Sequence, residues 1–249
     1  EIFKEARPDI DPDAEEILEK VMTVLGEAEW PFRQHVTYDE TGDRLLPVYE
    51  KIAQGPGLTK GWFIDHVETF SERNLERIAE LGGGIALQNR LQFQAEDFAA
   101  LYGTEALGKT PNFRAVLDLG VPVGGGTDAT RVTSYNPWFS IQWMSTGLSR
   151  GGTRMYGDDN LLTREEALRV WTTGSAWFTG DAGRKGAITP GQLADFAVLD
   201  RDYFAVTDAE IAKLQSELTL LGGEVVHAKG SFAHLDLKHM PPISPDWSP

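Results

Sequence analysis

The chain has 249 residues, 41% of them hydrophobic, which is enough to build a sizeable core. Its net charge of −15, from 23 basic and 38 acidic residues, argues against a nucleic acid or an anionic membrane as partner. The absence of cysteine excludes disulfides, zinc–thiolate sites and thiol catalysis.

No apolar stretch approaches the roughly 18 residues that a transmembrane helix needs. We therefore expect a protein that binds no membrane and no nucleic acid, with a cytoplasmic location. The chain begins with Glu1 rather than Met and has no signal-like segment, so we expect a processed chain or a piece of a longer protein.

The first half of the chain alternates helix and strand patterns. Apolar positions at helical intervals predict helices, with Ser71 as an N-cap and Pro47 in a first helical turn. Short aromatic or β-branched runs predict the strands between them, and four such alternations favour parallel βα units. The predicted helices span residues 13–25, 44–54, 71–83 and 111–120, and the predicted strands span 30–36, 62–69, 84–90 and, with its turn, 121–128.

After residue 150 the pattern changes. An amphipathic helix is predicted over 163–178, with Thr163 as its N-cap. A Pro-Gly turn and an alternating strand follow over 188–200, and a further strand is predicted over 224–235.

Three residues with metal-binding side chains stand at corresponding strand ends. His35 and His66 are 31 positions apart, and Asp128 follows 62 positions later. A (β/α)8 barrel spends about 31 residues on each βα unit, so these side chains would face one mouth at the carboxyl ends of the strands. Two imidazoles and a carboxylate are a sensible ligand set for a divalent metal such as zinc, and a carboxylate beside an acidified water can take its proton.

The other reading of these residues is structural, because a single histidine at a strand end more often makes a structural hydrogen bond. The shared spacing and position favour the metal site for the set of three. The remaining histidines, His227, His234 and His239, are interpreted as surface or structural residues.

Several segments together resemble the amidohydrolase superfamily, and within it amidohydrolase family 3. These segments are GVPVGGGTDA (120–129), NPW (136–138), LTREEALRVWTTGSA (162–176), GAITPGQLADFAVLD (186–200) and GGEVVHAKG (222–230). The resemblance implies that His35 and His66 are the metal-binding histidines after barrel strands five and six. It implies that Asp128, after strand eight, binds the metal and serves as general base. The implied cofactor is one or two divalent metal ions, with zinc as the first choice.

The family's first motif, a His-x-His pair at the end of strand one, occurs nowhere in the chain. The resemblance therefore implies an α/β fold that is the C-terminal half of a (β/α)8 TIM barrel, strands five to eight, followed by the C-terminal strands of a small β-sandwich. Residues 1–180 would form the barrel part and residues 181–249 the sandwich segment and tail. Because half a barrel exposes two sheet edges, we expect it to pair with the remaining N-terminal half, in the same protein or as a second chain, or to form a homo-oligomer.

Residues around the predicted site are interpreted as follows. Gln88 and Asn89, at the end of a strand, and Trp138, in the loop after strand eight, are candidate substrate contacts, although core packing is an equal alternative for Trp138. Asp39 and Asp65 depart from the family pattern and are interpreted as solvated loop carboxylates without a role.

The resemblance implies metal-dependent hydrolysis of a non-peptide C–N bond in an N-acyl amine, an N-formyl amine or a cyclic amide. The alternative is a catalytically incomplete barrel fragment that acts as a structural or interaction module. Ser149 lies in a G-x-S-x-G pattern, but no helix pattern follows it as a nucleophile elbow requires. The glycines before Asp128 lack the lysine of a phosphate-binding loop.

Overall fold

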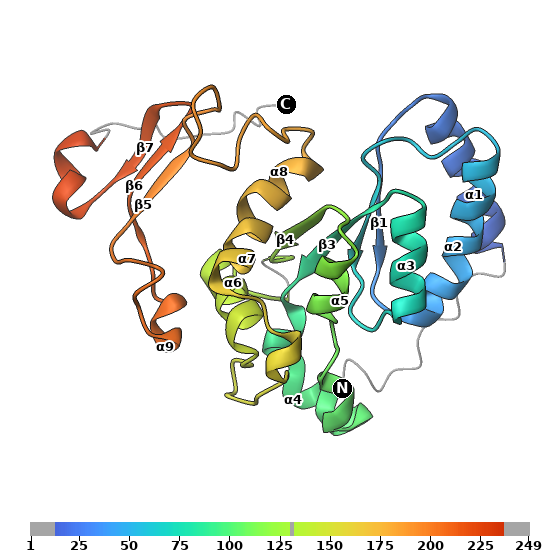
Figure 1. Cartoon of the computed structure of the whole chain (residues 1–249), viewed down its shortest axis with the longest axis horizontal. Coiled ribbons are helices and arrows are strands. Elements are labelled where there is room, and N and C mark those ends of the chain that lie inside the picture. Colours follow the sequence, from blue (N-terminus) through green and yellow to red (C-terminus); the bar gives the residue numbers. More distant parts are fainter. Residues whose placement is uncertain (1–12, 130–131, 237–249) are drawn as a thin grey trace, which may run out of the picture.

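Four parallel strands form the central sheet of the structure, a computed structural model that describes residues 13–129 and 132–236 (Figure 1). The strands pair in sequence order with continuous register, and helices connect them. This confirms the α/β class and the parallel βα units. The strands are β1 (Arg33–Val36), β2 (Phe63–His66), β3 (Gly84–Gln88) and β4 (Val123–Gly126).

The helices of this part pack in chain order against one another and against the sheet. Contacts join α1 to α2, α2 to α3, and α3 to α5. Fully buried Leu46, Tyr49, Leu75 and Ile78 carry this packing from the helix side. Each such side chain contributes about 1.5–3 kcal/mol by leaving water. The helices are α1 (Ala14–Glu27), α2 (Asp39–Gln54), α3 (Glu72–Glu80), α4 (Arg90–Tyr102) and α5 (Phe113–Asp118), with a 3-10 turn η1 (Thr104–Leu107) between the last two.

One helix prediction in this part has a wrong start, and one helix was not predicted. Helix α2 begins at Asp39, five residues before the predicted start, so Pro47 lies inside the helix instead of in its first turn. Pro47 is exposed, so water can bond the carbonyl that the proline leaves free. Helix α4 was not predicted, although Leu91, Ala95 and Phe98 are buried at helical spacing.

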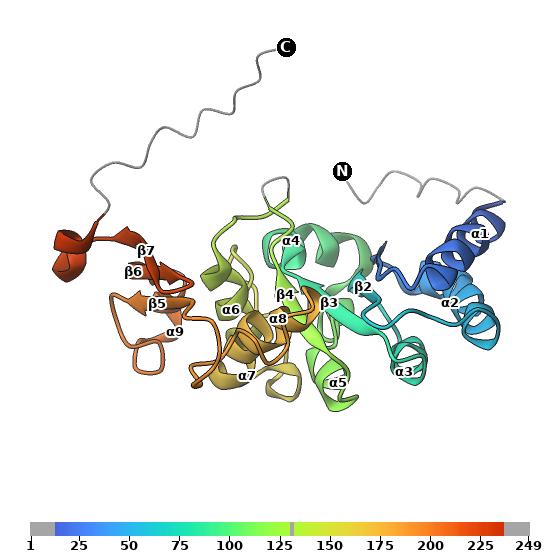
Figure 2. The same cartoon turned by 90° about the horizontal axis from the view of Figure 1, so that it is seen from above.

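The second part of the chain contains helices and a separate antiparallel sheet. The strands β5 (Phe196–Leu199), β6 (Ser216–Leu221) and β7 (Glu224–Ala228) pair in that order. Figures 1 and 2 both show this sheet at one end of the molecule and α1 at the other. The remaining elements are α6 (Pro137–Thr146), η2 (Asp158–Asn160), α7 (Arg164–Arg169), the π-helical η3 (Val170–Gly174), α8 (Ser175–Phe178), α9 (Asp208–Ile211) and η4 (Gly230–Leu235).

The predicted helix over 163–178 is present but is not uniform. Thr163 caps it as expected, because its hydroxyl accepts from Glu166 N while Glu166 accepts from Thr163 N in return. The π-helical segment interrupts it where Gly174 meets β4: a Cβ at Gly174 would lie 2.1 Å from Val123 O. The strand predictions for this part are too long: β5 covers only the end of the predicted range 188–200, and β7 only the start of 224–235. Strand β6 was not predicted.

The glycines of β4 make room for the helical segment that follows. A Cβ on Gly124 would lie 2.6 Å from the ring of Phe178, and one on Gly125 would lie 2.7 Å from the indole nitrogen of Trp171. The glycine run is therefore a close-packing device, and it leaves Asp128 just beyond the end of the strand.

Within the described residues, no helix is long and apolar enough to cross a membrane.

The parallel sheet ends at β1 and at β4, each of which pairs with one neighbour in the described part of the chain.

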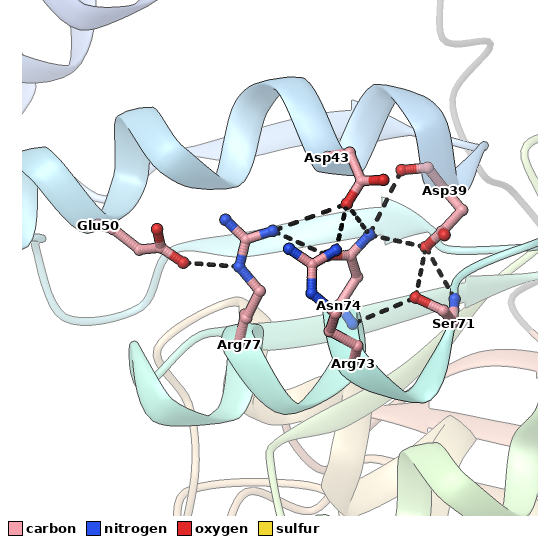
Figure 3. A network of polar contacts seen from close by, with 7 residues as sticks. All are labelled: Asp39, Asp43, Glu50, Ser71, Arg73, Asn74 and Arg77. Atoms are coloured by element: carbon pink, nitrogen blue, oxygen red, sulfur yellow. Dashed lines mark hydrogen bonds and ion pairs between the residues drawn. The ribbon is translucent and has the colours of Figure 1, made fainter.

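A polar network joins α2 to α3 and fixes the loops that follow β1 and β2 (Figure 3). One carboxylate oxygen of Asp39 accepts from Ser71 N at 2.8 Å, Ser71 Oγ at 3.0 Å and the side chain of buried Asn74 at 2.8 Å. The Asp39 N–H in turn donates to Thr69 Oγ1 at 3.0 Å. Asp39 is therefore not the solvated loop carboxylate expected from the sequence.

Replacing Asp39 by Ala should lower the free energy of unfolding by about 2 kcal/mol, because three hydrogen bonds to a carboxylate are lost and two of them hold Ser71, the N-cap residue of α3. Chemical denaturation checks this. Glu76→Ala, at an exposed position of α3 outside the network, is the control and should change stability by less than about 0.5 kcal/mol. Equal effects of the two substitutions would contradict this account of the network.

Candidate metal centre

His35 and His66 lie side by side at the carboxyl ends of β1 and β2. The parallel register pairs His35 with Asp65 and Val36 with His66, and the two imidazole rings meet edge to face with centroids 4.4 Å apart. His66 is 4% exposed. Nε2 of His35 lies 3.2 Å from Thr37 Oγ1. The two imidazoles thus lie together at the carboxyl ends of neighbouring strands, and their role as metal ligands stays a prediction.

Partial burial lowers the pKa of His35, which stays exposed on one side, and the neighbouring His66 lowers it further, while Asp128, Asp65 and Glu68 oppose the shift. The direction favours the neutral imidazole, which is the form that can donate a lone pair to a metal.

Asp128 approaches His66 from the far end of the sheet. It lies two residues beyond β4 in the left-handed region, with φ 53, and its side chain is 48% exposed. Its Oδ2 is 3.9 Å from Nε2 of His66. Two ligand atoms on one tetrahedral zinc ion lie about 3.3 Å apart, so this separation is close to that of a shared cation.

The nitrogen and oxygen donors are of the kinds that bind a divalent cation, but their positions do not form a complete coordination sphere. Nδ1 of His66 is buried and has no hydrogen-bond partner among the described residues. In the described ranges, no three His, Cys, Asp or Glu side chains converge as a complete metal-ligand group. The arrangement is therefore two close pairs that meet at His66. A cation between His66 and Asp128 would need further ligands or a small movement of His35.

A cavity of about 300 Å³ opens beside Asp128 on the sheet face. Gln88 lines it, is 6% exposed, and its Oε1 lacks a hydrogen-bond partner in the described structure. Of the three predicted substrate contacts, Gln88 is therefore the one that lines this cavity, and its Oε1 is available to accept a hydrogen bond.

The other two predicted substrate contacts lie in different surroundings. Asn89 is fully buried and donates to Gln92 Oε1 at 3.1 Å. Trp138 lies on α6, not in a loop as expected, and its ring packs against Tyr203 at 5.5 Å between centroids. Neither is among the described residues that line the cavity.

The interpretation of Asp65 as a solvated loop carboxylate is wrong. Asp65 lies within β2, is 3% exposed, and accepts from Nε of Arg33 at 2.7 Å. Both residues line the cavity, because alternate residues of neighbouring parallel strands face the same side. The sequence signal for its burial was its place inside the strand predicted over 62–69.

The remaining motif residues have ordinary surroundings. The hydroxyl of Ser149 donates to Glu96 and accepts from Thr153 N, so its hydrogen bonds are those of a structured loop. His227 and His234 are exposed, and His239 lies outside the described residues.

Replacing Arg33 by Gln should lower the free energy of unfolding by about 2 kcal/mol, because buried Asp65 loses its cation. Arg73→Gln is the matched control, since it breaks an ion pair with Asp43 in which both partners are exposed. It should cost less than about 1 kcal/mol. If Arg33→Gln costs no more than the control in urea denaturation, Asp65 does not depend on this partner.

Comparisons with known proteins place these observations in a family. A sequence model of the amidohydrolase family matches residues 4–227. The Bacillus subtilis amidohydrolase-family protein YtcJ is 28% identical over 171 residues, which cover 66% of this chain and 31% of that protein. The N-substituted formamide deformylase of Arthrobacter pascens is 26% identical over 183 residues, which cover 73% of this chain and 33% of the enzyme. The chain thus spans about a third of the length of these curated relatives.

Solved structures give the same fold. An uncharacterized metal-dependent hydrolase from Pyrococcus horikoshii aligns with a TM-score of 0.67 and 22% identity over 78% of this chain and 39% of its own. A mutant of the atrazine chlorohydrolase TrzN from Arthrobacter aurescens, complexed with zinc and atraton, aligns with a TM-score of 0.59 and 19% identity. The alignment covers 86% of this chain and 48% of that structure's chain. With the family match over most of its length, the chain belongs to the amidohydrolase family.

Proposed function

We propose that the protein to which this chain belongs is a metal-dependent hydrolase that cleaves a non-peptide C–N bond of an amide-type substrate. The observation that carries the proposal is the approach of His66 Nε2 to Asp128 Oδ2 at 3.9 Å, beside the ring of His35. Family membership adds support, as does the name of the A. pascens relative, which acts on N-substituted formamides.

We propose a divalent metal, with zinc as the first choice, held by His35, His66 and Asp128. When bound, such an ion polarises a carbonyl group and lowers the pKa of water. Zinc accompanies the A. aurescens structure, and the nitrogen and oxygen donors here suit the same ion. The two imidazoles would hold the ion, and His66 is fixed more firmly because it is almost fully buried.

Asp128 is assigned the role of proton carrier. Its side chain is 48% exposed, so it can face both the metal-binding histidines and an incoming substrate. As a carboxylate it can take a proton from the attacking water and return it to the leaving nitrogen. Gln88 is assigned to substrate, because its unpaired Oε1 lines the adjoining cavity and can accept from a substrate N–H.

Asp128→Asn should reduce turnover of an N-substituted formamide, or of another amide-type substrate found by screening, by about 10²- to 10⁴-fold. Asparagine keeps the shape and tolerates the left-handed backbone, so circular dichroism should be unchanged. Asp97→Asn, at an exposed position of α4, is the control and should retain activity. An Asp128→Asn variant that is folded and fully active would contradict the role of Asp128.

We further propose that the open edges and the cavity face of this sheet receive the remaining half of a (β/α)8 barrel. That half would supply the ligands that the described residues do not provide. Three exposed side chains form an apolar stripe on α1, the helix leading into the edge strand β1: Ile17, Val21 and Val24. The alignments cover 31% of the B. subtilis relative and 39% of the P. horikoshii structure, so most of each relative has no counterpart in this chain.

Val21→Lys should weaken association with a co-expressed N-terminal barrel half by at least about tenfold, because it puts a charge into an apolar contact. Val226→Lys, at an exposed valine of β7, is the matched control and should leave association unchanged. Analytical ultracentrifugation measures the dissociation constant of each variant with the barrel half. Should the chain be stable and monomeric, bind no barrel half and carry no activity, the alternative of a structural or interaction module would be favoured.

A further inference from the structure

Glu68 is a buried acid that the proposed chemistry does not use. It lies two residues beyond His66, in the turn that follows β2, and its side chain is 0% exposed. Burying a carboxylate costs several kcal/mol unless partners compensate for the lost water. A fully buried acid next to a candidate metal ligand therefore needs an explanation.

The turn that carries Glu68 has an unusual backbone. His66 and Val67 both have positive φ, 78 and 46, which is uncommon for residues other than glycine and strained for a β-branched valine. Val67 is 2% exposed, and its N–H donates to Val36 O at 3.0 Å. This turn directs the chain back, so that Oε1 of Glu68 lies 3.5 Å from Nδ1 of His66.

Arg90, at the start of α4, supplies the counter-charge. Its Nε donates to Oε1 of Glu68 at 2.9 Å, and its Nη2 pairs with Oε2. The Arg90 side chain is only 11% exposed, and its Nη1 donates to Gln94 Oε1 at 2.7 Å. A two-point contact with a guanidinium holds the carboxylate in one orientation.

Nδ1 of His66 is at the same time a buried ring nitrogen without a hydrogen-bond partner among the described residues. At 3.5 Å, the Glu68 oxygen is at the limit of a hydrogen bond, and a small rotation of the ring would bring it within range. Histidines that bind metals through one nitrogen usually donate the other N–H to a carboxylate or carbonyl.

We propose that Glu68 is the positioning residue of the metal centre: it accepts a hydrogen bond from Nδ1–H of His66 and thereby presents the lone pair of Nε2 to the cation beside Asp128. The inference rests on the proposed metal centre. Arg90 acts one step further out by fixing the carboxylate.

A purely structural role is the competing account. In that account Glu68 only neutralises Arg90 and ties α4 to the turn after β2. Its loss would then lower stability but leave the protonated nitrogen of His66, and the affinity for zinc, unchanged.

The test uses the complete protein in which this chain occurs, with zinc as the probe. Glu68→Gln should weaken zinc binding by about 10- to 100-fold in competition with a chromophoric chelator. Glu72→Gln is the matched control, because Glu72 is an exposed acid four positions along that pairs with Lys109. It should bind zinc like the wild type. Equal zinc affinity of Glu68→Gln and the wild type would overturn the inference.

A second measurement needs no substitution at Glu68. Nitrogen-15 NMR of histidine-labelled wild-type protein, assigned with His66→Asn, should show the His66 proton on Nδ1 and not on Nε2. The opposite tautomer would overturn the inference even if Glu68→Gln fails to fold. If the wild-type protein binds no zinc, the metal centre itself fails, and the tautomer alone then decides whether Glu68 orients His66.

Discussion

The parallel register between β1 and β2 is the constraint on which the candidate site depends. It pairs His35 with Asp65 and Val36 with His66, which brings the carboxyl ends of the two strands together. In a regular pleat His35 and His66 would face opposite sides of the sheet, but the left-handed backbone of His66, with φ 78, turns its ring toward that of His35, 4.4 Å away between centroids. A shift of one residue would turn His35 and its strand to the opposite face. Continuation of the register through β3 to β4 then directs Asp128 toward the same edge.

Polar contacts between the loops that follow β1 and β2 hold the carboxyl ends of these strands in place. Asp39 joins the loop after β1 to the loop after β2 through Thr69 and Ser71, while Glu68 and Arg90 join the second loop to α4. His66, Val67 and Asp128 occupy left-handed backbone conformations that cost about 1–3 kcal/mol each for residues other than glycine. Such strain persists only where the surroundings fix the conformation, and these contacts fix the turn that carries His66 and Val67.

The sequence predicted the part of this arrangement that follows from strand periodicity and spacing. The places of His35, His66 and Asp128 at strand ends were predictable, because a βα unit has a typical length and parallel strands end at one edge. The cap at Ser71 was predictable because it depends on neighbours in the chain.

Contacts across strands were harder to predict. Asp65 was interpreted as a loop acid although the strand predicted over 62–69 contains it, because its partner Arg33 stands on the neighbouring strand and is not apparent from the local sequence. The role of Glu68 depends on two left-handed residues and on a helix, α4, that the sequence prediction did not identify. Local patterns do not predict such a turn, since a β-branched valine disfavours a positive φ.

The most direct test of the account is the position of a bound metal in crystals of the complete protein grown with zinc. Anomalous difference density measured at the zinc edge should show a peak about 2.0–2.2 Å from both His66 Nε2 and Asp128 Oδ2, with His35 in the same coordination sphere. No peak at this edge of the sheet, or a peak that contacts neither His66 nor Asp128, would contradict the proposed metal centre and the hydrolysis assigned to it.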